Sequence, residues 1–437
     1  MPSLPRLATL VLFALMPLGC AAARAQAAAT ETLEKVVILK RHGVRAAMSS
    51  AEQLERYSAR PWPRFAVPAG YLTANGAALE RLFGAYYRAR YAPLGLFAGD
   101  GCAAAYYWAN RTQRTLASAQ ALASTLTPGC ANPVHSVADG ASDPLFDGAP
   151  ALRDPAAVAR MRAAIAGRIG GDARAWNAAQ ADAIDSLQQL LLQCAQRPCP
   201  ADAGSGSGSG KLRLDAVPAR LGDAEDAIPG IEGPAAAASG LSESLLMAWA
   251  DGQDFAALGW RGVDEASLLR AFAPHQAEFA LRLRAPAVAR MAASPLAARL
   301  LATLLDGSGQ ATRAEPIGGA ARLVVLSGHD GTLTLLAGML DLHWQLQGYQ
   351  PDQTVPGGAL VFERWRRADG ERVIRLRYTA QSLAQLRERR ALTVQAPPLE
   401  SPVFIPQCSR ADAAYDCPLP AFAAAVEAAL DPQFLTP

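Results

Sequence analysis

Two short segments carry side chains that suit phosphate chemistry. The first, Arg41-His42-Gly43-Val44-Arg45, holds two guanidinium groups and an imidazole on one turn. Arginine gives planar, bidentate hydrogen bonds to phosphoryl oxygens, and a neutral imidazole nitrogen can attack phosphorus to form a phosphohistidine. The alternative is an exposed basic turn that caps a helix. For five such residues taken without context this alternative would be favoured, and the context described below shifts the balance toward a phosphate site.

The second segment, Gly328-His329-Asp330-Gly331, supplies the complementary groups. His329 can hold a phosphoryl oxygen, and Asp330 can donate a proton to a departing alkoxide as a general acid. Alone, the His-Asp pair would indicate a helix N-cap, for which Asp330 is well suited. The two segments together are much less expected by chance than either one.

Each segment directly follows an apolar, β-branched run that predicts a buried strand. These runs are residues 34–40 (EKVVILK) and 322–327 (RLVVLS), and the pattern predicts a helix over 332–342. Strands that carry chemistry at their carboxyl ends and lead into helices are typical of open α/β sheets. We expect an α/β fold with a doubly wound, mostly parallel sheet and helices on both faces.

The middle of the chain is rich in alanine and has a helical period. Helices are predicted over 154–167, 174–196, 241–250 and 287–305. The run 204–210 (GSGSGSG) has no side chains for a core and predicts a flexible surface loop. We therefore expect an α/β domain over 26–142 and 286–437, with an inserted, mainly helical cap domain over 143–285.

The first 25 residues have the pattern of a secretory signal peptide. An apolar run over 7–18 precedes Ala23-Arg24-Ala25, an A-x-A cleavage site, so the mature chain is predicted to start near Gln26 in the periplasm or outside the cell. A lipid anchor at Cys20 is a minor alternative, because Pro17 stands where such sites usually carry an aliphatic residue. No later stretch is long and apolar enough to predict a transmembrane segment.

The amino-acid composition limits which classes of function we expect for the chain. The chain has 437 residues, 51% of them hydrophobic, which is enough for a large folded core. Lys and Arg number 41 against 39 Asp and Glu, so no strong overall field would attract nucleic acid or an acidic membrane. We expect a monomer that acts on a small molecule.

Six cysteines follow the signal segment, an even number that predicts three disulfides in an oxidising compartment. The sequence leaves their connectivity open, and the spacing favours Cys102 with Cys130, Cys194 with Cys199, and Cys408 with Cys417. They form no CxxC or metal-ligand pattern, and the five histidines are scattered. We expect neither a metal nor a cofactor.

These features resemble the histidine acid phosphatases, in the branch that holds bacterial phytases and periplasmic glucose-1-phosphatases. The two segments above match the family's signatures, as do the stretches LTANG (72–76), PLF (144–146) and PGGALVFERW (356–365). The three cysteine pairs also resemble bridges of this branch. The resemblance covers nearly all of the mature chain and implies an exported phosphomonoesterase that forms a phosphohistidine.

Carried over by this resemblance, the nucleophile is His42 and the proton donor is Asp330. The residues implied to bind substrate are Arg41, Arg45, Arg111, His329 and Glu243. Outside the resemblance, Arg111 would indicate a solvated helix residue. Glu243 is implied to project from a cap helix toward substrate, and a solvated carboxylate is an equal alternative.

Departures from the family pattern bear on the substrate. Ala47 and Gly331-Thr332 change the two turns, and two expected pocket cations are replaced by Ser49 and Ala292. We therefore expect phytate to bind weakly, within a broader preference that includes sugar phosphates. The alternatives are a narrow glucose-1-phosphatase and, from another class, a periplasmic protein that binds phosphate esters without hydrolysing them.

Overall fold

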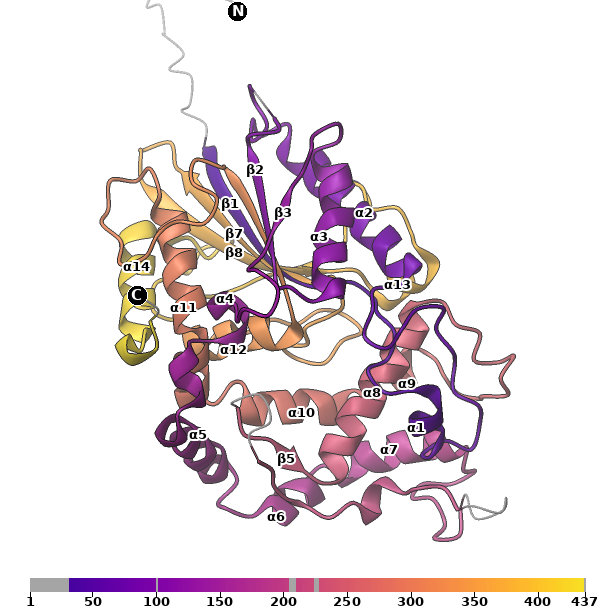
Figure 1. The fold of residues 1–437 in the computed structure, drawn as a ribbon. Coiled ribbons are helices and arrows are strands. Elements are labelled where there is room, and N and C mark those ends of the chain that lie inside the picture. Colours follow the sequence, from indigo (N-terminus) through magenta and orange to yellow (C-terminus); the bar gives the residue numbers. More distant parts are fainter. Residues whose placement is uncertain (1–30, 100, 204–209, 224–227, 436–437) are drawn as a thin grey trace, which may run out of the picture.

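The computed structural model describes residues 31–99, 101–203, 210–223 and 228–435 (Figure 1). The predicted signal peptide, the alternative anchor at Cys20 and nearly all of the glycine-serine run lie outside these residues. Figure 1 shows a twisted sheet with helices against both faces and a further group of helices beyond one end of the sheet.

The main sheet has eight strands, with the order β10-β8-β7-β1-β6-β2-β3 and β9 paired to β8. Their bounds are β1 Thr32–Arg41, β2 Ala105–Ala109, β3 Val134–His135, β6 Leu323–Gly328, β7 Ala359–Arg366, β8 Arg372–Ala380, β9 Leu399–Pro402 and β10 Cys417–Pro418. A short separate ribbon joins β4 (Arg220–Leu221) to β5 (Ile231–Glu232).

The two predicted strands lie next to each other at the centre of this sheet. β1 pairs with β6 in parallel, and β6, β2 and β3 continue the parallel part. β7, β8, β9 and β10 extend the sheet on the other side with antiparallel pairings. The predicted α/β class is confirmed. The parallel half is the part that carries the two chemical segments.

Helices cover both faces of the sheet (Figure 1). On one side lie α2 (Ala74–Tyr91) and α3 (Gln113–Leu126), and on the other α11 (Pro286–Leu305), α12 (Asp330–Leu340) and α14 (Leu419–Ala429). β1 is buried by both layers, and Val36, Val37, Ile38 and Leu39 have no exposed surface. Its continuous apolar run follows from burial on both faces.

The remaining helices are mostly short and gather below the sheet in Figure 1. They are α1 Ala51–Glu55, α4 Pro144–Asp147, η1 Pro150–Arg153, α5 Pro155–Arg168, α6 Ala173–Ala178, α7 Ala181–Leu192, η2 Leu214–Ala216, α8 Pro234–Ala250, α9 Glu265–Ala271 and α10 Ala273–Arg282. Elsewhere the chain forms α13 Leu383–Glu388 and η3 Pro432–Phe434.

One predicted helix is divided. The pattern predicts a single helix over 174–196, whereas the structure has α6 and α7 with a break near Gln180. Asn177 lies just before that break, and its side-chain oxygen accepts a hydrogen bond from the backbone N–H of Ala235, 2.8 Å away, at the start of α8. This contact with a distant segment is tertiary, so helical periodicity could not reveal it.

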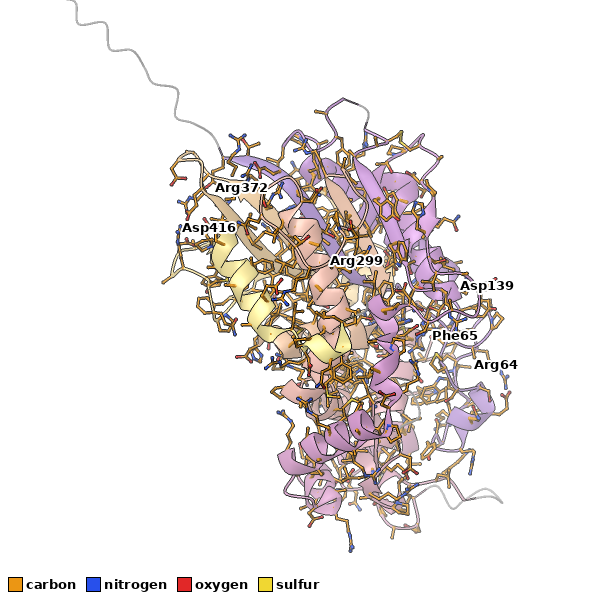
Figure 2. All side chains as sticks on the ribbon, turned by 60° about the vertical axis from the view of Figure 1, so that its left-hand side comes forward. Arg64, Phe65, Asp139, Arg299, Arg372 and Asp416 are labelled. Carbon is orange, nitrogen blue, oxygen red and sulfur yellow. A yellow bond between two sulfur atoms is a disulfide. The ribbon has the colours of Figure 1, made fainter. Side chains whose placement is uncertain are left out.

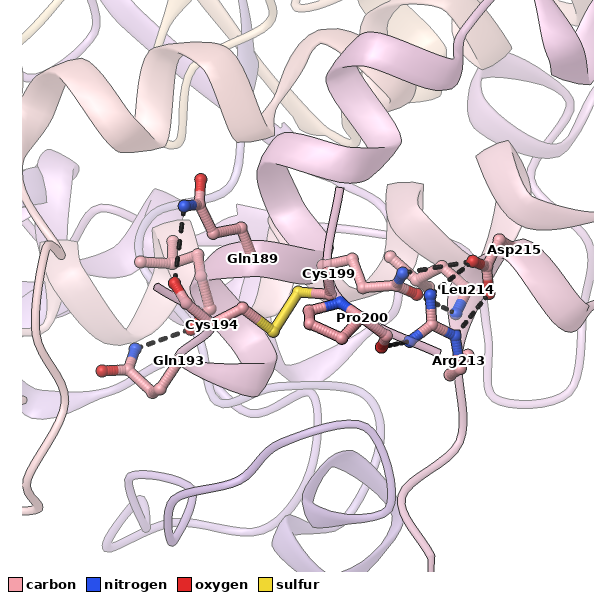
Figure 3. The surroundings of a disulfide bond; sticks show 10 residues. Gln189, Gln193, Cys194, Cys199, Pro200, Arg213, Leu214 and Asp215 are labelled. Atoms are coloured by element: carbon pink, nitrogen blue, oxygen red, sulfur yellow. Dashed lines mark hydrogen bonds and ion pairs between the residues drawn. A yellow bond between two sulfur atoms is a disulfide. The ribbon is translucent and has the colours of Figure 1, made fainter. Parts of the chain in front are cut away.

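The disulfides join the three pairs that the spacing favours: Cys102–Cys130, Cys194–Cys199 and Cys408–Cys417. Figure 3 shows the second, which closes the end of α7 beside an ion pair between Arg213 and Asp215. Three disulfides fit folding in an oxidising compartment.

Within the described residues, α11 alone is long and apolar enough to cross a membrane, and most of its apolar stretch is buried inside the protein. It packs mainly against α12, α4 and α14. Its composition therefore suits a helix at the centre of a large core.

Ion pairs tie together the end of the sheet where β1 begins. Figure 2 shows Arg372 and Asp416 at this end, away from the lower group of helices. Arg372 pairs with Glu34 at 2.7 Å, and the nearly buried Asp416 pairs with Arg375 at 2.5 Å. The chemical segments lie at the opposite ends of β1 and β6.

Candidate functional site

The central strands bring the two chemical segments to one point. In the parallel register Arg41 is opposite Gly328, and the backbone N–H of His42 donates to the Gly328 carbonyl at 2.9 Å. The rings of His42 and His329 are 5.6 Å apart between centroids and nearly perpendicular. The sequence prediction that these segments share a site at the strand tips agrees with this geometry.

The turn after β1 rests on the start of α2. Thr73 caps this helix by accepting from the Gly76 backbone N–H, and its own backbone N–H donates to the Val44 carbonyl at 3.0 Å. A Cβ on Gly76 would lie 2.1 Å from that carbonyl oxygen, so only glycine permits the approach. On the α3 side, the Gly43 N–H donates to Ser118 Oγ at 2.9 Å.

One ring nitrogen of His42, Nε2, has no hydrogen-bond partner among the described residues. Its Nδ1 lies 2.8 Å from the carbonyl oxygen of Gly43, and because a carbonyl only accepts, Nδ1 carries the proton. Nε2 then keeps its lone pair. Burial, together with the positive charges of Arg41 and Arg45, holds the pKa of His42 well below its usual 6.5. The imidazole therefore stays neutral in mildly acidic solution, as a nucleophile requires.

Arg41 and Arg45 share a carboxylate from α8. Glu243 Oε1 accepts hydrogen bonds from Arg41 and from Arg45, the latter at 3.3 Å. All three side chains are buried. Burial disfavours the charge of Arg41, but Glu243 and Asp330 outweigh it and raise its pKa. Burial lowers the pKa of Arg45, with Glu243 opposing.

Several buried polar atoms here lack partners among the described residues. They are the Nε atoms of Arg41, Arg45 and Arg114 and Oε2 of Glu243. Buried donors are nearly always hydrogen-bonded in folded proteins, so three unpaired guanidinium donors in one place indicate a site for an anion.

Arg111 and Arg114 differ in exposure and in their contacts with this arrangement. Arg111 is exposed and makes no hydrogen bond or ion pair with any described residue. Arg114, three residues later in the first turn of α3, places Nη2 3.4 Å from His329 Nδ1, and its charge contributes to the lowered pKa of His42. Burial and the charge of Arg45 lower its own pKa to about 10. The sequence prediction named Arg111, and Arg114 was missed.

Asn110, another residue that sequence reasoning missed, orients His329. Its Oδ1 lies 3.1 Å from His329 Nε2, while its Nδ2 donates to Asp147 Oδ1 at 3.3 Å. This arrangement puts a proton on Nε2 of His329. Burial, followed by the charge of Arg114, lowers the pKa of His329 to about 4. Asn110 lies beside Arg111 in the sequence, but no spacing rule marks it as a partner of His329.

Asp330 opens α12, and His329 is the N-cap. One carboxylate oxygen accepts from the Gly331 N–H at 2.7 Å, and the other lies 3.0 Å from Arg41. Burial would raise the pKa of Asp330, but the charges of Arg41, His275 and His329 lower it. A carboxylate at the positive end of a helix is favoured in the same direction.

A cavity of about 1260 Å³ opens in front of His329 and Asp330. Its walls come from the strand tips after β2 and β6, from α4 and η1, and from β4, β5, α8 and α10. Apolar side chains such as Phe146 and Ile231 line part of it, and four arginines stand around the rest. A ligand of several rings or phosphates has room here.

The two positions without expected cations differ. Ala292 lines the cavity, whereas Ser49 lines a separate small pocket beside α1. Only Ala292 therefore still supports the expectation of weak phytate binding, because Ser49 lies outside the cavity. That expectation also omitted three arginines that line the cavity from other elements, Arg153, Arg220 and Arg282, and it counted Arg111 only as a ligand of the transferring phosphate.

Among the residues that the structure describes, no group of three or more His, Cys, Asp or Glu side chains could hold a metal ion.

Known proteins resemble the chain over most of its length. The family model of the histidine phosphatase superfamily (branch 2) matches residues 32–379. Phytase AppA of Escherichia coli is 32% identical, over 96% of both chains. A glucose-1-phosphatase of Salmonella typhimurium is 29% identical, over 89% of this chain and 91% of the relative.

Solved structures of bacterial phytases are also similar to this chain. The apo form of Hafnia alvei phytase has a TM-score of 0.80 and 30% identity, covering 94% of this chain and 99% of that one. A phytase from Citrobacter braakii has a TM-score of 0.79 and 28% identity, covering 93% and 100%.

Proposed function

Because the chain belongs to branch 2 of the histidine phosphatase superfamily and hydrolyses phosphomonoesters, we propose that His42 is the nucleophile of this reaction and Asp330 its proton donor. The observation that carries the proposal is the free Nε2 of a neutral, buried His42 beside three arginines with unpaired donors. In a binding protein such a nitrogen would have no task.

Substrate binding begins at the arginines. Phosphoryl oxygens accept hydrogen bonds from Arg41, Arg45 and Arg114, and we assign to Arg114 the role that the resemblance implied for Arg111. Glu243 Oε1 already accepts from Nη2 of Arg41 and of Arg45, so a phosphate uses their unpaired Nε donors and competes with Glu243 for the Nη2 atoms. We propose that Glu243 acts at the substrate site by competing with the phosphate, and its direct contact with substrate stays a prediction.

The reaction then proceeds in two steps. Nε2 of His42 attacks phosphorus, the bond to the ester oxygen breaks, and Asp330 gives its proton to that oxygen as the alcohol leaves. In the second step Asp330 takes a proton from water, which attacks the phosphohistidine and releases phosphate. Arg41, Arg45 and Arg114 face the charge that develops on the transferring group.

The substrates we propose are phytate and sugar phosphates, with a narrow glucose-1-phosphatase as the alternative. The names of the relatives support both, since they include a phytase and glucose-1-phosphatases. We further propose an exported monomer whose cap domain, over 143–285, forms the far wall of the cavity. The three disulfides support export.

The test is His42→Ala, with His343→Ala as a matched control because the His343 side chain is mostly exposed and outside the cavity. We expect no turnover of p-nitrophenyl phosphate by the first variant and normal turnover by the second. Rapid quench of the parent should trap phosphate on His42. Continued turnover without labelled protein would show direct attack by water, and binding without turnover would favour the phosphate-ester binding protein.

A further inference from the structure

A buried ion pair lies behind the turn that carries His42, and the mechanism above does not use it. Lys40, the last residue but one of β1, pairs with Glu80 in α2, and their side chains are 0% and 1% exposed. Burial lowers the pKa of Lys40 and raises that of Glu80, and each partner opposes the change. Compared with two apolar side chains of similar volume, such a pair adds little net stability. We therefore looked for its effect on the geometry of the turn.

Lys40 holds one end of the peptide group that precedes His42. The Arg41 carbonyl oxygen accepts a hydrogen bond from Lys40 Nζ at 3.3 Å. At the other end of the same peptide group, the His42 N–H donates to the Gly328 carbonyl at 2.9 Å. This peptide group is therefore fixed on one side by β6 and on the other by a side chain of β1.

The peptide group that follows His42 is also held at both ends. The His42 carbonyl oxygen accepts from the Gly357 N–H at 2.9 Å, just before β7, and the Gly43 N–H donates to Ser118 Oγ at 2.9 Å in α3. All four polar atoms of the two peptide groups thus have partners. Lys40 is the only charged group among those partners.

Glu80 keeps the Lys40 side chain within reach of the turn. One of its oxygens, Oε2, accepts from Lys40 Nζ. The other, Oε1, lies so close to the turn that a Cβ on Gly43 would be 3.0 Å from it, and a Cβ on Gly357 3.1 Å. Glu80 therefore lies between the turn and the segment before β7, and it fixes the lysine there.

We propose that Lys40, held in place by Glu80, is a positioning residue for His42 and acts through the Arg41 carbonyl. The proposal rests on the proposed function, since it takes His42 as the nucleophile. A small displacement of an attacking atom greatly slows a reaction step. Substrate binding should change less, because the Arg41 side chain is held separately by the Thr354 carbonyl at 2.7 Å and by Glu243.

The experiment compares variants that keep or remove the acceptor for Lys40. Glu80→Gln keeps an oxygen acceptor, whereas Glu80→Met has a similar volume without one. The double variant Lys40→Met/Glu80→Met removes both polar groups and leaves no buried charge. The matched control is Lys35→Met/Asp306→Met, because this pair, 2.7 Å apart, lies at the opposite end of the same strand. For each we measure kcat and KM for p-nitrophenyl phosphate, the rate of phosphohistidine formation by rapid quench, and the urea midpoint.

We expect Glu80→Met and the double variant to lower kcat and the rate of phosphohistidine formation about tenfold or more, with KM changed less than about threefold. Glu80→Gln and the control should stay within about threefold of the parent in kcat. The double variant should keep a urea midpoint close to that of the parent, which would separate positioning from stability.

A folded double variant with the kcat of the parent overturns the proposal, as does an equal fall in the control. If the double variant does not fold, Glu80→Met carries the test, and a kcat equal to that of Glu80→Gln overturns the proposal. The proposed function is judged separately, by whether the parent forms phosphohistidine at all.

Discussion

At the residue scale, the arginine that we assign to the transferring phosphate is Arg114 and not Arg111. Arg114 is half-buried beside His329, and its Nε has no partner among the described residues. We expect Arg114→Ala to lower kcat/KM for p-nitrophenyl phosphate at least about 100-fold, because a bidentate contact with the transferring group is lost. Arg64→Ala, an exposed arginine paired with Glu52, is the control. A loss below tenfold for Arg114→Ala would contradict its role in the clamp.

The charge state of Asp330 predicts how activity depends on pH. Its pKa is lowered, so the free enzyme carries a carboxylate and must gain a proton before the ester oxygen leaves. We expect that proton to arrive with a singly charged substrate. Above the second pKa of the phosphate, about 6, kcat/KM should then fall about tenfold per pH unit.

The measurement compares pH profiles for two monoesters whose second pKa values differ. The alkaline limb should move with the substrate. If the fall in kcat/KM at high pH occurs at the same pH for both substrates, the titrating group belongs to the enzyme. Asp330 would then be protonated before substrate binds.

The loss of rate caused by removing the Asp330 proton should also depend on the leaving group. We expect Asp330→Asn to slow glucose 1-phosphate at least about 100-fold more than p-nitrophenyl phosphate, because a nitrophenolate leaves with little protonation whereas a sugar alkoxide does not. Phosphate release from both substrates is measured under single-turnover conditions. Equal losses on both would indicate that Asp330 only positions the substrate.

At the element scale, the disulfides differ in how much chain they constrain. Cys102–Cys130 encloses β2 and α3, with a separation of 28 residues, whereas Cys194–Cys199 has a separation of 5. Loop-closure entropy predicts losses of about 3–4 kcal/mol and about 2 kcal/mol when the respective cysteine pairs become serine. Urea unfolding of the two double variants measures both. A larger loss from the short loop would show that the surroundings in Figure 3, and not chain entropy, dominate its contribution.

A comparison of the elements also shows which strands the sequence periodicity predicts correctly. Residues 34–40 and 322–327 were predicted as strands. β1 contains the whole first run, β6 contains the second except Arg322, and each strand ends one residue beyond its run. Their apolar runs are continuous because helices bury them on both faces. The region after 356 is different, since nothing in its pattern shows that β7 pairs antiparallel to β1. Strand direction is decided by the path of the whole chain.

At the scale of the whole molecule, the buried histidines couple the site to stability. The pKa of His329 is about 4 in the folded protein and about 6.5 unfolded, so the unfolded chain binds a proton more readily. The folded state therefore loses stability as pH falls from 6.5 to 4, by about 3 kcal/mol at most from this group. His42 acts in the same direction. Urea midpoints between pH 4 and 7 should rise with pH, less steeply in His329→Asn, and parallel curves would contradict this linkage.

The sequence by itself determined the α/β architecture, and it pointed to His42 and Asp330 as the nucleophile and proton donor that we propose. Each depends on local information: a turn at a strand end, a helix start, and apolar runs with the right period. The tertiary structure decided which arginine reaches His329, that Asn110 holds that histidine, and that Glu243 bridges Arg41 and Arg45. These contacts join strand tips and helices far apart in the chain. These contacts depend on helical register and on the packing of distant segments. Neither can be predicted from the spacing of residues along one stretch.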